Sequence, residues 1–264
     1  FYEMWGTKTP QEALNKIESQ KLKLDRQPAN LEEQALSLVG RDIYDTLIRD
    51  YTKKQWKTDP TDLPADIIKR LPVRFTYDNN YFNDKYTGMP VGGFTQIFQR
   101  MLQDSEVILD VDYFENKDYW DSKATKIIYT GPIDKFFDYK FGKLEYRSLR
   151  WENLKLNTDN FQGNPVVNYT DLDIPYTRIL EHKWFDYQNQ KGTIISYEYS
   201  ETYDGTNEPY YPIRNENNIN VYEKYDEIAK SMSNHYFGGR LATYSYYDIH
   251  QVIAQALKKV KEIV

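Results

Sequence analysis

Arginine and tyrosine are the residue types of this 264-residue chain that best suit ligand chemistry. Arg70 and Arg74 share one short segment that runs into aromatic residues, and Arg178 lies in a separate strand-like segment. A guanidinium binds phosphate oxygens bidentately, and a tyrosine adds a hydroxyl donor and a stacking face. These residue types indicate a binding site for an anionic, ring-bearing small molecule. More often, however, such arginines are simply solvated and such tyrosines are half-buried strand residues. The residues alone do not decide between a binding site and this structural explanation.

The composition excludes several other chemistries. With 34 basic and 40 acidic side chains the formal charge is -6, which argues against a general nucleic-acid binder. The absence of cysteine excludes disulfides, thiolate zinc sites and thiol nucleophiles, and three dispersed histidines disfavour a metal site or a histidine base. No apolar run approaches the roughly 20 residues of a membrane span. We therefore expect a cytoplasmic protein without a metal, a nucleic-acid partner or a membrane segment.

Helical signals dominate residues 10–102, the region that must position Arg70. Thr9-Pro10 followed by Glu12 predicts a helix start, and Asn30 predicts a second helix that Gly40 ends. The further predicted helices are residues 41–51, with Ile43, Tyr44, Leu47, Ile48 and Tyr51 on one face, residues 65–70, and an amphipathic helix over 94–102.

Short β-type runs separated by Asn, Asp and Gly follow, and they must position Arg178. The alternation from Thr193 to Tyr199 suits an antiparallel sheet with one solvated face. Asp248 predicts the cap of a final helix with a buried apolar stripe. The predicted strands are residues 107–111, 126–130, 145–151, 165–169, 176–183, 193–200 and 235–238.

This order of elements predicts an α+β fold in three parts. Residues 1–102 form a mostly helical domain, residues 103–233 an antiparallel sheet domain, and residues 234–264 a closing strand and helix that need something to dock on. No GxGxxG, phosphate loop or paired carboxylates for acid–base work occur in the chain. From the residues alone, we can infer only that the protein binds an anionic small molecule.

A series of short strings carries a more specific signal. The strings include Tyr51-Thr52-Lys53-Lys54-Gln55-Trp56, Lys69 to Arg74, Tyr81-Phe82-Asn83, Gly88-Met89-Pro90, Ile174-Pro175-Tyr176-Thr177-Arg178, Pro209 to Arg214, and Gly239 to Tyr244. Taken in this order over nearly the whole chain, they resemble the UDP-galactopyranose mutase family of the bacterial type.

The resemblance implies an isomerase, a flavoprotein that interconverts UDP-galactopyranose and UDP-galactofuranose for cell-wall polysaccharide synthesis. In that family reduced FAD acts through an adduct between flavin N5 and the sugar, and the protein supplies orientation and electrostatics. The fold implied is an α/β flavoprotein with a Rossmann-like FAD domain, and a homodimer is suggested. Because the chain begins at Phe1 and lacks the GxGxxG segment, we expect a truncated piece that binds FAD poorly and does not turn over.

The resemblance also implies roles for individual residues. Arg70 and Arg178 would be the catalytic arginines that close on the diphosphate. The family usually has aromatic residues where this chain has Leu47 and Ile48. The residues implied to contact the substrate are Tyr51, Trp56, Tyr81, Asn168, Tyr211 and Tyr246, and those implied at the flavin are Arg240 and Asp248.

Two other functions compete with this interpretation. One is another FAD-dependent oxidase of amine-oxidase-like architecture, which would share the Gly239-Arg240 region but lack the paired arginines. The other is a tyrosine-rich carbohydrate-binding module, suggested by the 25 tyrosines alone. Dependence of UDP binding on Arg178 separates the mutase from both.

Overall fold

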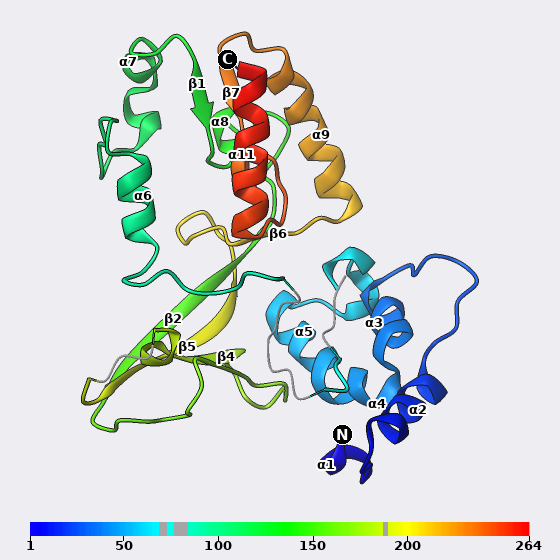
Figure 1. The fold of residues 1–264 in the computed structure, drawn as a ribbon. Helices are drawn as coiled ribbons and strands as arrows, with labels where there is room; N and C mark the ends of the chain where they lie inside the picture. The colour runs from blue at the N-terminus through cyan, green and yellow to red at the C-terminus, as the bar shows by residue number, and fades with distance from the viewer. Residues whose placement is uncertain (69–72, 77–83, 187–189, 264) are drawn as a thin grey trace. The chain divides into compact units, whose positions relative to one another are not determined.

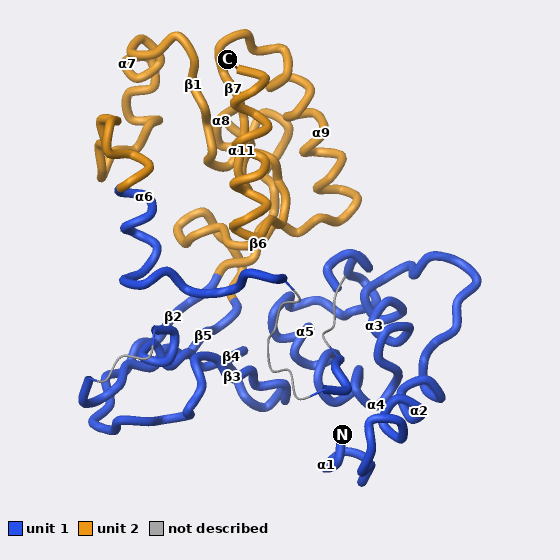
Figure 2. Tube along the Cα trace, in the orientation of Figure 1, with its two compact units in different colours: residues 1–99, 149–200 blue, residues 100–148, 201–264 orange. Residues whose placement is uncertain are grey.

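The computed structural model describes residues 1–68, 73–76, 84–186 and 190–263, and it combines helices with an antiparallel sheet, as the α+β prediction required (Figure 1). The chain divides into two compact units (Figure 2). Unit 1 contains residues 1–99 and 149–200, and unit 2 contains residues 100–148 and 201–264. The units interleave along the chain, whereas the predicted domains are continuous segments.

The two helices predicted from Thr9 and Asn30 begin at the predicted residues, and the second ends at the predicted Gly40. The Thr9 hydroxyl accepts a hydrogen bond from the Glu12 amide at 3.2 Å, and Asn30 Oδ1 accepts one from the Glu33 amide at 2.9 Å. Gly40 ends the second of these helices with φ 80°, and a Cβ there would lie 2.9 Å from Gln20 Cβ, so only glycine fits. The α-helices that start within residues 1–99 are α1 (Tyr2–Trp5), α2 (Pro10–Gln20), α3 (Leu31–Val39), α4 (Arg41–Ile43), α5 (Arg49–Trp56) and α6 (Thr95–Met101).

The helix predicted over residues 41–51 continues to Trp56 and contains a π-helical turn at Tyr44–Ile48. Leu47 departs from the shared face that the spacing predicted, because it is 50% exposed, whereas Ile48 is 7% exposed. A π turn adds a residue and rotates the positions that follow, which explains the difference. The predicted helix 65–70 is a 3-10 turn at Ala65–Ile67, and residues 69 and 70 lie outside the described residues.

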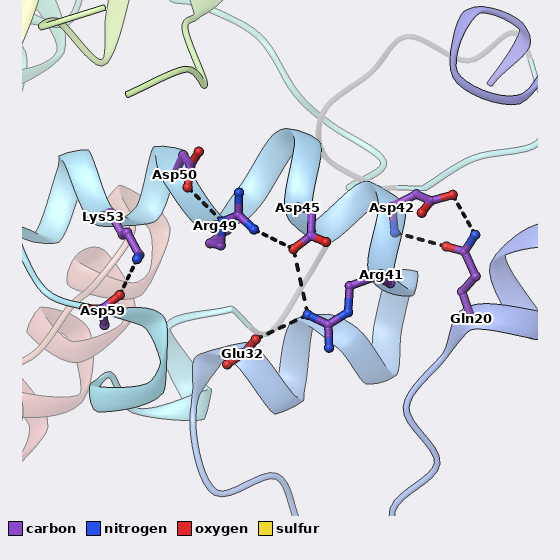
Figure 3. Close-up of polar contacts among 9 residues, drawn as sticks. All are labelled: Gln20, Glu32, Arg41, Asp42, Asp45, Arg49, Asp50, Lys53 and Asp59. Carbon is purple, nitrogen blue, oxygen red and sulfur yellow. Dashed lines mark hydrogen bonds and ion pairs between the residues drawn. The ribbon is translucent and has the colours of Figure 1, made fainter. Parts of the chain in front are cut away.

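Ion pairs mark the solvent side of α4, the π turn and α5 (Figure 3). Arg49 contacts Asp45 at 3.0 Å and Asp50 at 2.8 Å, and Arg41 lies 3.5 Å from Glu32. These side chains are largely solvent-accessible, so each pair contributes little to stability. Their position leaves the opposite side of the helix for packing.

The larger sheet has the strand order β3-β4-β5-β2-β6. In unit 1, β4 pairs antiparallel with both β3 and β5, and the buried Ile179 and Ile195 lie on these strands. The predicted strands in this region are therefore confirmed, with shifted ends. The bounds are β2 (Tyr146–Leu156), β3 (Val166–Asn168), β4 (Arg178–Glu181), β5 (Thr193–Thr202) and β6 (Tyr211–Pro212), of which β2 and β5 continue from one unit into the other.

Unit 2 has an aromatic core and a small parallel sheet. Tyr146, Tyr225 and Tyr244 are at most 1% exposed and pack with aliphatic residues and further rings. The predicted strands 126–130 and 235–238 are present as β1 (Ile127–Tyr129) and β7 (His235–Phe237), which pair in parallel. The α-helices of unit 2 that follow α6 are α7 (Lys117–Asp121), α8 (Ile133–Phe136), α9 (Glu216–Lys230), α10 (Gly239–Ala242) and α11 (Ile249–Ile263).

Two predictions in unit 2 were wrong. Residues 107–111 do not form a strand; Asp110 has φ 58°, and the structure pairs no described strand with this segment. The final helix is present as α11, but its apolar stripe is not buried, with Ile253 46% and Leu257 64% exposed. Periodicity predicts that a helix is amphipathic, whereas burial also needs a covering element. Among the described residues, none of the helices is both long and apolar enough to cross a bilayer.

Candidate functional site

Four of the implied site residues that the structure describes lie in unit 1, on helix α5 and on the β3–β4 hairpin. Tyr51 and Trp56 belong to α5, where Tyr51 is half-buried and Trp56 is 8% exposed. Asn168 ends β3 and Arg178 begins β4, and the two are register partners across the antiparallel pair. The hairpin therefore brings together two residues that are ten positions apart in the sequence.

Arg178 is anchored by a buried carboxylate. Its Nε lies 2.8 Å from Glu198 Oε1, and Glu198 is also its register partner on β5. The Glu198 carboxylate also accepts a hydrogen bond from the Thr177 hydroxyl at 2.7 Å and is 1% exposed, whereas the Arg178 side chain is 27% exposed. This arrangement fixes the direction of a cation that solvent can still reach, which suits recognition of an anion.

Helix α5 is fastened to the β3–β4 hairpin by a lysine that the sequence analysis did not single out. Lys54 Nζ donates to the backbone oxygens of Tyr169 at 2.5 Å, Ile174 at 3.1 Å and Tyr176 at 3.0 Å. Lys54 is 5% exposed and lies three residues after Tyr51. A lysine on the same helix face as apolar residues was the available signal, because such a lysine needs buried acceptors.

The implied residues of unit 2 form a second cluster. The ring centroids of Tyr211 and Tyr246 are 5.4 Å apart, and Arg240 Cζ lies 4.9 Å from the Tyr246 ring and 5.7 Å from the Tyr211 ring. Arg240 Nη2 also donates to the Tyr210 carbonyl oxygen at 3.0 Å. Cation–π contacts of this kind orient a guanidinium over aromatic faces.

Asp248 immediately precedes α11, as predicted. Its amide donates to Gln251 Oε1 at 2.8 Å, and its carbonyl oxygen accepts from the Gln251 amide at 3.0 Å. The Gln251 side chain thus caps the helix start as the Glu or Gln at helix position N3 of a capping box does.

Arg70 and Tyr81 lie outside the described residues. A cavity of about 400 Å³ in unit 1 contains none of the implied site residues. Its lining includes Met89, Pro90, His182 and Phe185.

A family model now gives these clusters a context. Residues 46–246 match the model for UDP-galactopyranose mutase. This range includes Tyr51, Trp56, Asn168 and Arg178 of unit 1 and Tyr211, Arg240 and Tyr246 of unit 2. The chain therefore belongs to the UDP-galactopyranose mutase family, and the resemblance stated from the sequence is confirmed.

Individual relatives agree with the family. The chain is 39% identical over 256 residues to the dTDP-fucopyranose mutase of Escherichia coli, covering 95% of this chain and 68% of that protein. It is 41% identical over 241 residues to a probable UDP-galactopyranose mutase of Klebsiella pneumoniae, covering 89% of this chain and 61% of that protein. It thus spans about three-fifths to two-thirds of the length of these relatives.

A solved structure has a similar fold. It is described as reduced UDP-galactopyranose mutase and matches with a TM-score of 0.55 at 14% identity, over 89% of this chain and 66% of that one. Since the identity is low, this match bears on the fold alone, and it agrees with the predicted combination of helices and sheet.

The unit 2 cluster contains a buried cationic donor at Arg240. Arg240 Nε is buried and has no hydrogen-bond partner among the described residues, although its Nη2 is paired. A buried cationic donor without an acceptor suits a carbonyl or anionic group of a cofactor. Gly238 and Gly239, which precede it, present no side chain that could obstruct such a group. The chain contains no GxGxxG that could hold the cofactor diphosphate.

Proposed function

We propose that the complete protein containing this chain is a flavin-dependent mutase that interconverts the pyranose and furanose forms of UDP-galactose. The observation that carries the proposal is the family match over residues 46–246, which includes every implied site residue except Asp248. Membership favours the mutase over an amine-oxidase-like enzyme or a carbohydrate-binding module. The homodimer and the cytoplasmic location stay predictions.

The diphosphate is the part of the substrate that the described residues suit best. Arg178, held by Glu198, binds a diphosphate oxygen and neutralises the charge that grows as the bond between the anomeric carbon and UDP breaks. Arg70 supplies the second guanidinium. Tyr81, Tyr211 and Tyr246 donate their hydroxyl groups to the phosphates.

The remaining residues orient the rest of the substrate. Tyr51 stacks on the uracil ring, Trp56 lies near the sugar, and Asn168 contacts the nucleotide sugar beside Arg178. Arg240 and Asp248 hold the flavin edge. Reduced FAD, when bound, supplies the nucleophilic nitrogen of the reaction.

The test is an activity assay of the complete protein with dithionite-reduced FAD and UDP-galactofuranose. Formation of UDP-galactopyranose is followed by chromatography. We expect conversion by the wild type and a loss of kcat/KM of about 100-fold in Arg178→Ala, because one charge-stabilising donor is removed. Conversion that does not change in Arg178→Ala would contradict the role of this arginine.

A second substrate has specific support, because one relative of 39% identity is a dTDP-fucopyranose mutase. The same assay is therefore run with dTDP-fucopyranose. Conversion of the dTDP sugar alone would replace the substrate but keep the mutase class. Conversion of neither sugar would overturn the proposed function.

A further inference from the structure

A buried ammonium group joins the two elements that carry the unit 1 site residues. Lys54 is 5% exposed, and its Nζ donates to three backbone oxygens between positions 169 and 176, more than 100 residues away. An ammonium group has three N–H donors, so these contacts use all of them. Burial lowers the pKa of Lys54, and the negative charges of Asp171 and Asp173 partly offset that effect.

The three acceptors belong to the loop between the two site residues of the hairpin. The loop begins directly after Asn168 and ends just before Arg178. The Tyr169 amide donates to the Thr177 carbonyl oxygen at 2.9 Å, which closes the base of the loop. A displacement of this loop would therefore move the side chains on both of its ends.

Helix α5 carries the other site residues close to Lys54. Tyr51 lies one helical turn before Lys54, on the same side of the helix. A second contact fixes the same helix to β5, because the Ser200 hydroxyl donates to the Gln55 carbonyl oxygen. The segments that carry Tyr51 and Arg178 are thus joined through Lys54, within one unit.

We propose that Lys54 is a positioning residue that holds the 169–176 loop against α5 and thereby sets the spacing between Tyr51 and Arg178. Resting on the proposed function, this spacing sets the separation between the ring that stacks on the uracil and the guanidinium that binds the diphosphate. Lys54 acts through the backbone of the loop and does not contact the substrate.

The same unit contains a matched control. Lys183 is 6% exposed, and its Nζ also donates to three backbone oxygens, those of Asp159, Gln190 and Gly192. Its acceptors hold loops that carry none of the implied site residues. Lys54→Met and Lys183→Met therefore remove the same chemistry, but only the first frees the loop beside Arg178.

The experiment compares both variants in the complete protein by UDP titration calorimetry, hydrogen exchange and thermal unfolding. We expect Lys54→Met to weaken UDP binding by about tenfold or more and to speed exchange of the Tyr169 and Thr177 amides. Lys183→Met should lower the melting temperature comparably but leave UDP affinity within about twofold of the wild type.

Other outcomes decide against the proposal. Equal losses of UDP affinity in the two variants, or unchanged affinity in Lys54→Met, would show that Lys54 is only structural. If Lys54→Met does not fold, Lys54→Arg replaces it, and UDP affinity equal to that of the wild type despite faster exchange in the loop would overturn the role. If the wild type binds dTDP but not UDP, the comparison is made with dTDP, and failure to bind either nucleotide would instead overturn the proposed function itself.

Discussion

The two units bury polar groups in different ways. In unit 1, buried charged side chains fasten the backbone of distant loops: Lys54 and Lys183 each hold three carbonyl oxygens, and Glu181 accepts from the amides of Phe161 and Gln162. Burial by itself raises the pKa of Glu181, but these amide hydrogen bonds, together with the Thr193 and Trp184 side chains, keep that pKa below its ordinary value.

In unit 2 the polar groups of the aromatic core cluster are phenol hydroxyls, although the buried Asp134 carboxylate also accepts from the Leu144 amide at 2.8 Å. The Tyr225 hydroxyl accepts from the Phe141 amide at 2.9 Å and donates to the Gly142 carbonyl oxygen at 2.7 Å. The Tyr244 hydroxyl lies 2.6 Å from the Glu145 carbonyl oxygen and 2.8 Å from that of Ile213. Each ring also contributes a large apolar area to the core.

The difference shows what each unit can hold in place. An ammonium group offers three donors and a full charge, so one lysine can fix an irregular loop with no regular hydrogen bonding of its own. A phenol offers one donor but packs a large ring, so it consolidates elements that already touch. The predictions below test this contrast, beginning with the largest effect on stability.

Tyr225→Phe should remove the hydroxyl that pairs two buried backbone groups. The Phe141 amide and the Gly142 carbonyl oxygen would then lose their partner. We expect the free energy of unfolding to fall by about 1–3 kcal/mol. Urea unfolding followed by circular dichroism measures this free energy. An unchanged midpoint would contradict the proposed difference between the units, because the hydroxyl would then contribute nothing to stability.

Tyr146→Phe is the matched control in the same core. Tyr146 is 1% exposed, and its hydroxyl has no hydrogen-bond partner among the described residues. Deleting a buried, unpaired hydroxyl should leave stability unchanged or raise it by up to about 1 kcal/mol. The same unfolding measurement applies, and a loss as large as that of Tyr225→Phe would reveal a partner for this hydroxyl.

The smallest expected effect concerns acid sensitivity in unit 1. The hydrogen bond from Arg26, with further help from the Ala29 amide, lowers the pKa of Glu33 from 4.5 to about 2. Because the folded-state pKa is depressed, the stabilisation is present above pH 4.5 and is lost as the pH falls toward 2.

Glu33→Gln should therefore reduce stability slightly at neutral pH and make its decline between pH 4.5 and 2 shallower. Melting temperatures measured across this pH range test it. A decline of the same steepness in wild type and variant would show that other carboxylates account for the acid sensitivity.

Local chemistry made some of the fold predictable from the sequence. The starts of α2 and α3 follow from Thr9 and Asn30, whose side chains bond amides only three residues ahead. The strand at residues 193–202 follows from its alternating pattern. Helix α9 was missed, although Asn215 caps it and Val221, Tyr222 and Tyr225 follow at helical spacing.

The candidate site was also predictable from the sequence only in part. The strings of the family implied roles for Arg178, Tyr51 and Arg240 without any structure, and these roles stay predictions. They did not reveal Glu198 as the anchor of Arg178, because that contact joins neighbouring strands whose register is set by the whole sheet.

The sequence by itself determined the family, through its series of short strings, and the starts of α2 and α3, because each cap depends on groups only a few positions apart. Tertiary structure decided which apolar stripes are covered, as the exposed face of α11 shows, and which distant groups meet, as Lys54 and the 169–176 loop show. Contacts of that kind depend on packing across the chain, and the linear pattern of residues does not specify them.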